Sequence, residues 1–304
     1  NTWNLIFIKI MYKIVCFGEV LWDVFSTHKK IGGAPLNVAT RLQGFSNEVV
    51  LISAIGNDDL GKLILDYLQE HQINAEHIQV LNDFKTGVVS VTLNNKGAAT
   101  YKIEHPKAWD KIAFIEKVSD LVKQADAFVF GSLITRDEVS KKTLYKLLEF
   151  ADYKIFDINL RPPFYDKDIL IELMQKADFI KLNDDELYEV SAFMGSKFNN
   201  LEQNLHFISE ETNTKHICVT KGEHGAVLFY NDQLFYNSGF KIKVADTVGS
   251  GDSFLGSLIS KLTNGEKPQK AIDFACAVGA LVAQNEGANP KITDYDIADF
   301  IRGR

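Results

Sequence analysis

Two kinds of hydrophobic pattern alternate along the chain. Short apolar runs bounded by Gly, Asn or Asp predict buried β-strands. These runs are 49–55, 127–130, 154–158, 179–182 and 216–220. In the longer segments between them, such as 60–71 and 139–150, apolar residues recur every three or four positions, which predicts amphipathic helices. Alternating strands and helices predict an α/β fold of three layers, α/β/α, in which helices cover both faces of a mostly parallel sheet.

One region departs from this rhythm. Residues 86–102 alternate with a period of two around Asn-Asn-Lys-Gly, which predicts an antiparallel hairpin. The short run 20–28 is expected to pair with it, so we expect lid strands inserted at about 19–30 and 86–104. Such strands often form a flap over a site or a dimer surface, and an edge hairpin without a role is the alternative.

Composition narrows the classes of partner. The 304 residues include 33 Lys and Arg against 40 Asp and Glu, a net charge of −7, and no long basic run. The chain therefore carries no electrostatic footprint for nucleic acid or for an anionic membrane. Its longest apolar stretch, 274–283, is far shorter than the ~20 residues that cross a bilayer.

Cysteine spacing and chain length bear on the compartment and the number of domains. Cys16, Cys218 and Cys276 lie far apart in the sequence and form no CxxC pair, so we expect neither disulfides nor a zinc ribbon. We therefore expect a cytoplasmic location, where thiols stay reduced. We expect one domain over 11–304, which is long enough to bury its own core. Residues 1–10 lack the basic segment and cleavage site of a secretory signal, and we expect them to be an extension outside the fold.

The strongest chemical signal is Asp-Thr-Val-Gly-Ser-Gly-Asp at 246–252. Apolar residues after it repeat at helical spacing until Gly265, so the glycine-rich turn is expected to open a buried helix. Gly249 and Gly251 allow backbone N–H groups to converge on a ligand, and the positive end of the helix dipole adds to the attraction. The turn therefore predicts a phosphate-binding site.

Asp252 stands in the first turn of that predicted helix. A carboxylate in this place repels a phosphate, so a purely structural role does not explain its presence at a phosphate site. It could instead accept the proton of an attacking hydroxyl. Asp is also favoured in a first turn for capping, so helix capping is the alternative role.

A second glycine turn, Gly-Gly-Ala-Pro-Leu-Asn, lies at 32–37. Gly32 and Gly33 permit a polar ligand to approach the backbone, and Asn37 can both donate and accept, which suits a sugar hydroxyl. A turn without a ligand is the alternative.

Three polar patches follow predicted strands, at the edge where open parallel sheets bind ligands. An arginine there can meet a phosphate, an Asn and a Glu at helix-turn spacing can organise hydrated magnesium, and two glycines leave room for a nucleotide. The candidates are Arg161, Asn183, Glu186, Gly222 and Gly225. Solvated loops and helix caps are the alternatives.

Two other motifs are excluded. Residues 56–62 have the spacing of a P-loop, but Leu63 replaces the magnesium-binding Ser or Thr, and Asp58 and Asp59 would oppose a phosphate. The seven histidines show no HxH or HExxH spacing, so a metal hydrolase is not expected.

Taken together, GGAPLNVA at 32–39 and DTVGSGDSF at 246–254 resemble the two signature regions of the PfkB, or ribokinase-like, family of carbohydrate kinases. Further segments resemble the family in order: GEVLWD at 18–23, IGNDDLG at 55–61, DINLR at 157–161, KLNDDE at 181–186, TKGEHG at 220–225 and EGANP at 286–290. The resemblance implies a ribokinase-like fold with a small β-strand lid. It also implies transfer of a phosphoryl group from ATP to a sugar hydroxyl, with Mg²⁺.

The resemblance assigns roles on the acceptor side. Asp252 would be the catalytic base, and the anion hole for the transferring phosphoryl group would be formed by Gly249, Ser250 and Gly251. The sugar would be held by Asp23, Gly32, Gly33 and Asn37. Arg161 would approach the reacting end of the sugar or the phosphate.

It also assigns roles on the nucleotide side. Asn183 and Glu186 would order Mg²⁺ through water, and the nucleotide would be bordered by Thr220, Gly222 and Gly225. Many family members bind a monovalent cation such as K⁺, and Asp246 and the backbone carbonyls of Val248 and Gly287 fall at matching positions. Lys291 stands where some ribokinases carry a small hydroxyl ligand, which leaves the potassium requirement open.

The substrate rests on two smaller likenesses. Ala34-Pro35 and Ala108-Trp109-Asp110 resemble bacterial fructokinases, which implies conversion of D-fructose to fructose 6-phosphate. Kinases acting on ribose, 2-keto-3-deoxygluconate or a nucleoside are the alternatives. A non-catalytic sugar or nucleotide sensor is the alternative from another class, against which the presence of Asp252 argues. In several members the lid is also a dimer surface, which implies a homodimer through the lid strands.

Overall fold

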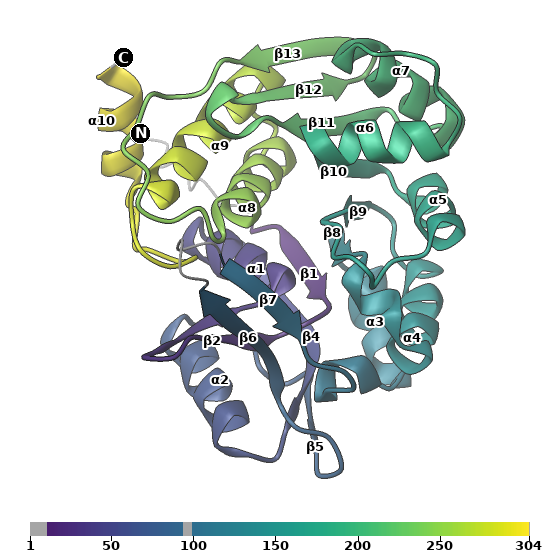
Figure 1. Ribbon diagram of the computed structural model, residues 1–304, viewed down its shortest axis with the longest axis vertical. Helices are drawn as coiled ribbons and strands as arrows, with labels where there is room; N and C mark the ends of the chain where they lie inside the picture. Colours follow the sequence, from purple (N-terminus) through teal and green to yellow (C-terminus); the bar gives the residue numbers. More distant parts are fainter. Residues whose placement is uncertain (1–10, 94–98, 304) are drawn as a thin grey trace, which may run out of the picture.

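The computed structural model describes residues 11–93 and 99–303, and its largest element is a nine-stranded sheet. The predicted extension at 1–10 and the predicted turn at 94–98 lie outside the described residues. Figure 1 shows the sheet running from β13 at the top to β5 at the bottom. The strand order is β13 (Gln233–Asn237), β12 (Ala226–Tyr230), β11 (His216–Thr220), β10 (Phe179–Asn183), β9 (Lys154–Asp157), β8 (Ala127–Gly131), β1 (Lys13–Phe17), β4 (Glu48–Gly56) and β5 (Ile78–Leu81).

The predicted parallel sheet is confirmed. All five predicted strands are present, as β4, β8, β9, β10 and β11. In the large sheet, the neighbouring strands β5, β4, β1, β8, β9, β10 and β11 all pair in parallel. The antiparallel edge of β12 and β13 has no counterpart in the prediction. Asn231 and Asp232 join these two strands with φ values of 48° and 62°, the left-handed conformation of a two-residue hairpin turn.

Helices cover both faces of the sheet, as predicted. One face packs against α1 (Ala34–Gly44), α2 (Asp59–Glu70), α8 (Ser250–Thr263) and α9 (Pro268–Ala283). The other packs against α3 (Glu116–Lys123), α4 (Glu138–Leu148), α5 (Lys167–Lys176), α6 (Asp184–Phe193) and α7 (Leu201–Thr212). Along β1, Ile14 and Cys16 join the first layer and Val15 and Phe17 the second, because successive strand residues point to opposite faces.

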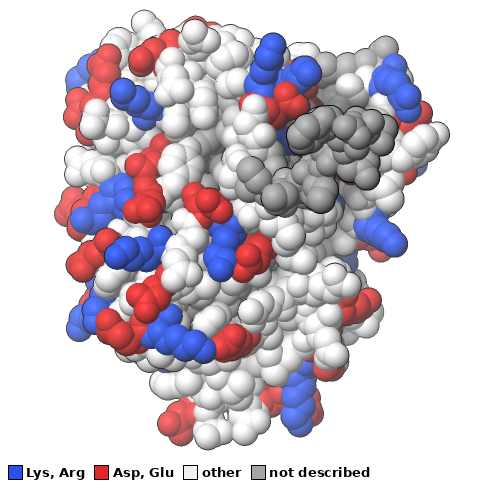
Figure 2. Space-filling model, turned by 180° about the vertical axis from the view of Figure 1, so that it is seen from behind, with Lys and Arg blue, Asp and Glu red and all other residues white. Residues whose placement is uncertain are grey.

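The remaining elements are short or lie at the end of the chain. The last helix, α10 (Asp294–Arg302), packs against α9 through Ile297 and Phe300. The 3₁₀ turns are η1 (Ala108–Lys111), η2 (Leu133–Arg136) and η3 (Gly222–His224). Among the described residues, no helix has the length and apolar character to cross a membrane. Figure 2 shows Lys and Arg interspersed with Asp and Glu on the back of the molecule, which agrees with the absence of a basic run in the sequence.

A second, four-stranded sheet forms the predicted lid. Its order is β3 (Lys29–Gly32), β2 (Leu21–Val24), β6 (Gly87–Leu93) and β7 (Ala99–Ile103). The expected pairing of the two lid segments is confirmed, since β2 pairs with β6 in parallel while both outer pairs are antiparallel. Figure 1 labels three of these strands, β2, β6 and β7, below α8.

The chain order places ligand-binding residues at one edge of the large sheet. From β1 the chain builds outward through β4 and β5, then returns to β8 on the other side of β1 and builds outward again. Ligands of open α/β sheets bind at the carboxyl ends of the strands near such a reversal. The segments after β1, β9, β10 and β11 contain several of the predicted site residues, and the glycine turn at 246–252 follows β13.

The segment with P-loop spacing has a structural role. Asp58 is the N-cap of α2, where its Oδ1 accepts the Gly61 amide at 2.9 Å. The same carboxylate accepts both the amide and the hydroxyl of Thr86, just before β6. Because its oxygens are engaged and negatively charged, this turn anchors the lid to α2 and offers no phosphate cradle.

Candidate active site

The glycine turn before α8 leaves backbone donors without partners. Gly249 is the N-cap, with φ of 73°, and a Cβ there would lie 2.3 Å from Ala288 Cβ, so only glycine fits. Among the described residues, the amides of Gly249, Gly251 and Asp252 donate to no acceptor. Unpaired amides at the positive end of a fourteen-residue helix suit a negatively charged ligand, and the anion site predicted from the sequence stays a prediction.

Ser250 contributes differently from its two neighbours. Its amide donates to Thr247 O at 3.3 Å, and its hydroxyl donates to Gly279 O at 2.9 Å. The hydroxyl therefore ties α8 to α9. Of the predicted anion hole, Gly249 and Gly251 carry the amides without acceptors.

Asp252 is held by a side chain from the other end of the chain. Asn37 Nδ2 donates to Asp252 Oδ2 at 2.7 Å, and Asn37 Oδ1 accepts from Asn289 Nδ2 at 2.8 Å. Asp252 caps no backbone amide of α8, whose N-cap is Gly249 and has no side-chain hydrogen bond. The capping alternative therefore does not describe this carboxylate.

The surroundings of Asp252 adjust its proton affinity. Burial, followed by the negative charge of Asp157, raises its pKa to about 6, while the Asn37 hydrogen bond, Lys181 and Arg161 oppose the rise. A carboxyl group with this pKa is mostly ionised at neutral pH and still basic enough to accept a proton. Both properties suit a general base.

Beneath the turn lies a buried charged cluster. Lys181 Nζ donates to Asp157 Oδ1 at 2.9 Å, and a Cβ on Gly251 would lie 3.5 Å from the same ammonium. Burial alone would lower the pKa of Lys181, but Asp157, Glu186 and Asp252 outweigh it and raise the pKa above its usual value. Three carboxylates around one ammonium leave negative charge in excess, and Asp157 Oδ2 is buried without a partner among the described residues.

On the lid side, the carboxylates of Asp23 and Glu19 lie near the start of α1. A Cβ on Gly32 would lie 2.8 Å from Asp23 Oδ2, so the glycine lets this carboxylate approach the turn. Burial raises the pKa of Asp23 to about 6, against the opposing charge of Arg161. Gly33, with φ of 109°, is the N-cap of α1, and a Cβ there would lie 2.4 Å from Glu19 O.

Glu19 is a site residue that sequence reasoning missed. It is only 4% exposed, and its Oε1 accepts the Ala34 amide at 3.3 Å while Oε2 has no partner among the described residues. Burial raises its pKa to about 7, and the charge of Asp252 adds to the rise. An acidic residue directly after the buried strand β1, in Gly18-Glu19, was the available signal.

Arg161 faces this group of carboxylates. It is exposed, donates from Nη1 to Leu160 O at 2.9 Å and makes no ion pair within the described residues. Its charge lowers the pKa of Glu19, Asp23 and Asp252, so it acts on all three carboxyl groups. An arginine without a fixed carboxylate partner is available to a phosphate or to hydroxyl groups.

The predicted magnesium residues form a helix cap. Asn183 is the N-cap of α6, its Oδ1 accepts the Glu186 amide, and Glu186 Oε2 accepts the Asn183 amide, both at 2.8 Å. Glu186 Oε1 accepts the Leu160 amide, which positions the segment that carries Arg161. The cap alternative is thus present in the structure, and each carboxylate oxygen keeps a second lone pair for a water.

The cluster fits a divalent ion held through water. Among the described residues, no three His, Cys, Asp or Glu side chains converge to ligate a metal directly. The excess negative charge of Asp157, Glu186 and Asp252 around Lys181, with one oxygen of Asp157 unpartnered among the described residues, suits a hydrated divalent cation.

The predicted nucleotide residues meet at the end of β11. Thr220 ends the strand, and its hydroxyl donates to Leu182 O of β10 at 3.4 Å. Gly222 and Gly225 have φ of 54° and 77°, and a Cβ on Gly225 would lie 2.1 Å from Asn237 O. A Cβ built on Gly222 would meet no atom of the described residues within 4 Å, so this loop is open to them on that side.

The residues predicted for a monovalent cation do not fit one. Asp246 Oδ2 accepts Lys30 Nζ at 2.9 Å and the Gly287 amide at 3.1 Å, and Oδ1 accepts the Val248 amide at 3.0 Å. The carboxylate that would bind K⁺ therefore already has an ammonium partner, which would repel a second cation.

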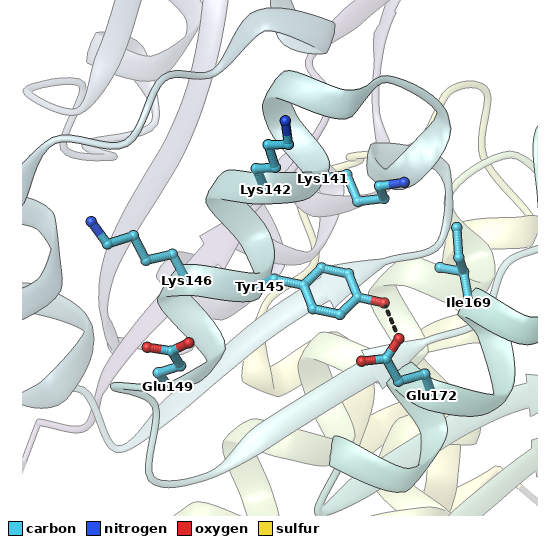
Figure 3. A pocket seen from close by; sticks show the side chains of 7 residues that line it. All are labelled: Lys141, Lys142, Tyr145, Lys146, Glu149, Ile169 and Glu172. Atoms are coloured by element: carbon cyan, nitrogen blue, oxygen red, sulfur yellow. Dashed lines mark hydrogen bonds between the residues drawn. The ribbon is translucent and has the colours of Figure 1, made fainter.

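Two regions lie outside this site. The fructokinase-like Ala108, Trp109 and Asp110 are buried, Asp110 pairs with Arg136, and the Trp109 ring lies against Gly87 at the start of the lid strand β6. A depression of about 420 Å³ lies between α4 and α5, where Tyr145 donates to Glu172 (Figure 3). None of the predicted site residues lines it.

Comparison with known proteins identifies relatives along the whole chain. Fructokinase-2 of Oryza sativa subsp. japonica is 27% identical, over 94% of this chain and 92% of its own length. Fructokinase-2 of Solanum lycopersicum is 28% identical over 92% of each.

Solved structures share the fold. Fructokinase with bound ATP from Xylella fastidiosa superposes with a TM-score of 0.86 at 20% identity, covering 97% of this chain and 99% of its own. The 2-dehydro-3-deoxygluconokinase of Thermotoga maritima gives 0.85 at 19% identity, with the same coverage. The profile described as pfkB family carbohydrate kinase matches residues 5–294. This match over nearly the whole sequence shows that the chain belongs to the pfkB family of carbohydrate kinases.

Proposed function

We propose that this carbohydrate kinase phosphorylates D-fructose with ATP and releases fructose 6-phosphate and ADP. The observation that carries the chemistry is the position of Asp252. Its carboxylate lies in the first turn of α8, beside amides without acceptors, and Asn37 holds it. A base and an anion hole within one helical turn suit phosphoryl transfer to a hydroxyl.

The proposed transfer uses residues from the lid, from α1 and from α8. Asp23, Gly32, Gly33 and Asn37 border the sugar, so that its reacting hydroxyl lies near Asp252. As the hydroxyl oxygen bonds to the γ-phosphorus and the bond to the bridging oxygen of ADP breaks, Asp252 takes the proton. The unpaired amides of the glycine turn stabilise the charge on the phosphoryl oxygens, and Arg161 adds positive charge from the opposite side.

On the nucleotide side, Thr220, Gly222 and Gly225 border ATP in this proposal. Mg²⁺, when bound, would neutralise phosphate charge, held through water by Asn183 and Glu186. The positive charge of the buried Lys181 ammonium lowers the pKa of Asp252 and so helps this carboxylate to remain ionised beside the other carboxylates.

Fructose is proposed over other sugars for two reasons. The two plant proteins named above as sequence relatives are fructokinases, and Ala34-Pro35 opens α1 directly after the two glycines of the sugar side. Ribose, 2-keto-3-deoxygluconate and nucleosides are the competing acceptors within the family.

Two further proposals follow from the likeness to the family. The four-stranded lid has β3 and β7 as its edge strands, and an unpaired edge can pair with a second copy, so we propose a homodimer through the lid strands. We also propose that the protein works in the cytoplasm, where its three buried thiols would stay reduced.

The substrate proposal is tested by sugar-dependent ADP release with ATP and Mg²⁺. The panel is fructose, ribose, 2-keto-3-deoxygluconate, fructose 6-phosphate and adenosine, with Asp252→Ala as the control. Turnover selective for fructose and lost in the variant supports the proposal. Selectivity for another acceptor overturns the substrate and keeps the kinase, and silence with ATP still bound favours a sensor.

A further inference from the structure

Lys30 connects the lid to the glycine turn. Its Nζ lies 2.9 Å from Asp246 Oδ2, and the two side chains are 26% and 18% exposed. Partial burial would raise the pKa of Asp246, but the donors Val248, Lys30 and Gly287 outweigh it and lower the pKa. A partly buried ion pair is screened by water less than one at the surface.

Asp246 joins three separate segments through its two oxygens. The Val248 amide belongs to the turn before α8, the Gly287 amide belongs to the loop between α9 and α10, and Lys30 belongs to β3 of the lid. The Gly287 loop also contains Ala288, which lies against Gly249 at the N-terminus of α8. The conformation of the anion turn therefore depends on how firmly Asp246 is held.

The position of Lys30 on the lid is fixed by strand pairing. Lys30 stands opposite Asp23 in the β2–β3 ladder, so the two side chains share one face of the small sheet. The charges of Lys30 and Asp246 both act on Asp23, with opposite signs. Lys30 is thus near both the sugar side and the phosphate side of the site.

We propose that the ammonium of Lys30 occupies the place of a monovalent cation beside the anion turn, and that the kinase works without K⁺. Lys30 acts as a positioning residue: it holds Asp246, and through Asp246 the turn that presents the free amides. The kinetic test of this inference rests on the proposed kinase function. The test by thermal unfolding, which detects cation binding, does not.

The first test measures kinetics in a buffer whose only added cation besides Mg²⁺ is tetramethylammonium, at constant ionic strength. The variants are Lys30→Met, which keeps the apolar stem, and Lys29→Met, which removes the neighbouring charge that points to Trp22. We expect wild-type turnover to change less than about twofold on replacement of tetramethylammonium by K⁺. We expect Lys30→Met to lower kcat about tenfold, with a smaller change in the KM for sugar, and Lys29→Met to lower neither.

The second test needs no activity. A cation that binds the folded state and not the unfolded state raises the thermal midpoint of unfolding, and the midpoint increases with the ratio of cation concentration to dissociation constant. We expect K⁺ at about 100 mM to leave the wild-type and Lys29→Met midpoints at their tetramethylammonium values, and to raise that of Lys30→Met.

Three results would overturn the inference. They are activation of the wild type by K⁺ of several-fold, a K⁺-specific rise of the wild-type midpoint, and a Lys30→Met variant that matches Lys29→Met in both tests. If the sugar panel shows no kinase activity at all, the proposed function fails, while the midpoint comparison still decides the role of Lys30.

Discussion

Asn37 Nδ2 lies 2.7 Å from Asp252 Oδ2, and this hydrogen bond joins α1 to α8 across 215 positions of the sequence. Asn37 is buried and is also bonded to Asn289, so its amide plane is fixed on two sides. The residue predicted from the first glycine turn therefore orients the residue predicted from the second. The two sequence signatures meet at one carboxylate.

Substitution Asn37→Ala is expected to move the acidic limb of the pH profile. Asp252 must be ionised to accept a proton, so kcat/KM should rise with pH through a pKa near 6 in the wild type. The Asn37 hydrogen bond favours the ionised form, so its loss should shift this limb to higher pH and lower kcat about tenfold. Thr40→Ala, one turn further along α1, is the control, and an unshifted limb in Asn37→Ala would contradict the assignment.

Glu19→Gln is expected to change how stability depends on pH. The pKa of Glu19 is about 7 in the folded protein against 4.5 for the free group, so its contribution to stability is complete below 4.5 and is lost as the pH rises to about 7. The wild type should therefore lose about 2–3 kcal/mol relative to Glu19→Gln between pH 4.5 and 8. Urea unfolding at both pH values measures this, with Glu70→Gln on the exposed end of α2 as the control; parallel curves for wild type and Glu19→Gln would refute it.

Val89→Asp is expected to disrupt the lid. Val89 is 5% exposed and packs with Leu21, Phe25 and Ile103, so a buried charge there should separate β6 from β2. The KM for sugar should rise about tenfold while the affinity for ATP stays near wild type. Val80→Asp, on the exposed side of β5, is the matched control. Unchanged sugar affinity in Val89→Asp would favour the edge hairpin without a role.

Gly249→Ala is expected to damage the anion turn beyond the cost of its backbone conformation. Gly249 and Gly265 lie at opposite ends of α8 with φ of 73° and 74°, so alanine is strained equally at both. A Cβ at Gly249 would also lie 2.3 Å from Ala288 Cβ, whereas a Cβ at Gly265 would meet no atom within 4 Å in the part of the chain that the structure describes. Gly265→Ala should cost about 1 kcal/mol of stability and no activity, and Gly249→Ala should weaken ATP binding and turnover as well. Equal kinetics for the two variants would show that the turn does not bind phosphate.

The fold was predictable from the sequence where one physical signal decides the structure. A short apolar run between turn residues is buried on both faces, so β4 and β8 to β11 were identified within one or two residues of their observed ends. The helix after the glycine turn was predictable because apolar spacing and glycine chemistry agree there. The edge strands β12 and β13 were missed because the left-handed turn at Asn231 and Asp232 was not recognised as a hairpin signal.

The site was predictable in its local parts and not in its long-range pairs. Glycine turns and polar residues at strand ends are visible in sequence, but the partner of a charge is set by tertiary packing. The ion pair of Lys30 with Asp246 spans 216 positions, and it changes the expectation for K⁺. Lys181 interrupts an apolar strand, and its burial against Asp157 explains why such a residue is tolerated there.

The most direct test of the central claim is the turnover of Asp252→Asn with the preferred sugar, measured beside its affinity for ATP by calorimetry. The variant keeps the shape of the side chain and the amides of the turn, and it removes only the basic oxygen. A fall in kcat of about 10²- to 10⁴-fold, with ATP affinity near wild type, is the result expected of a catalytic base. Turnover within a few-fold of wild type would contradict it, and Asp252 would then have only a structural role.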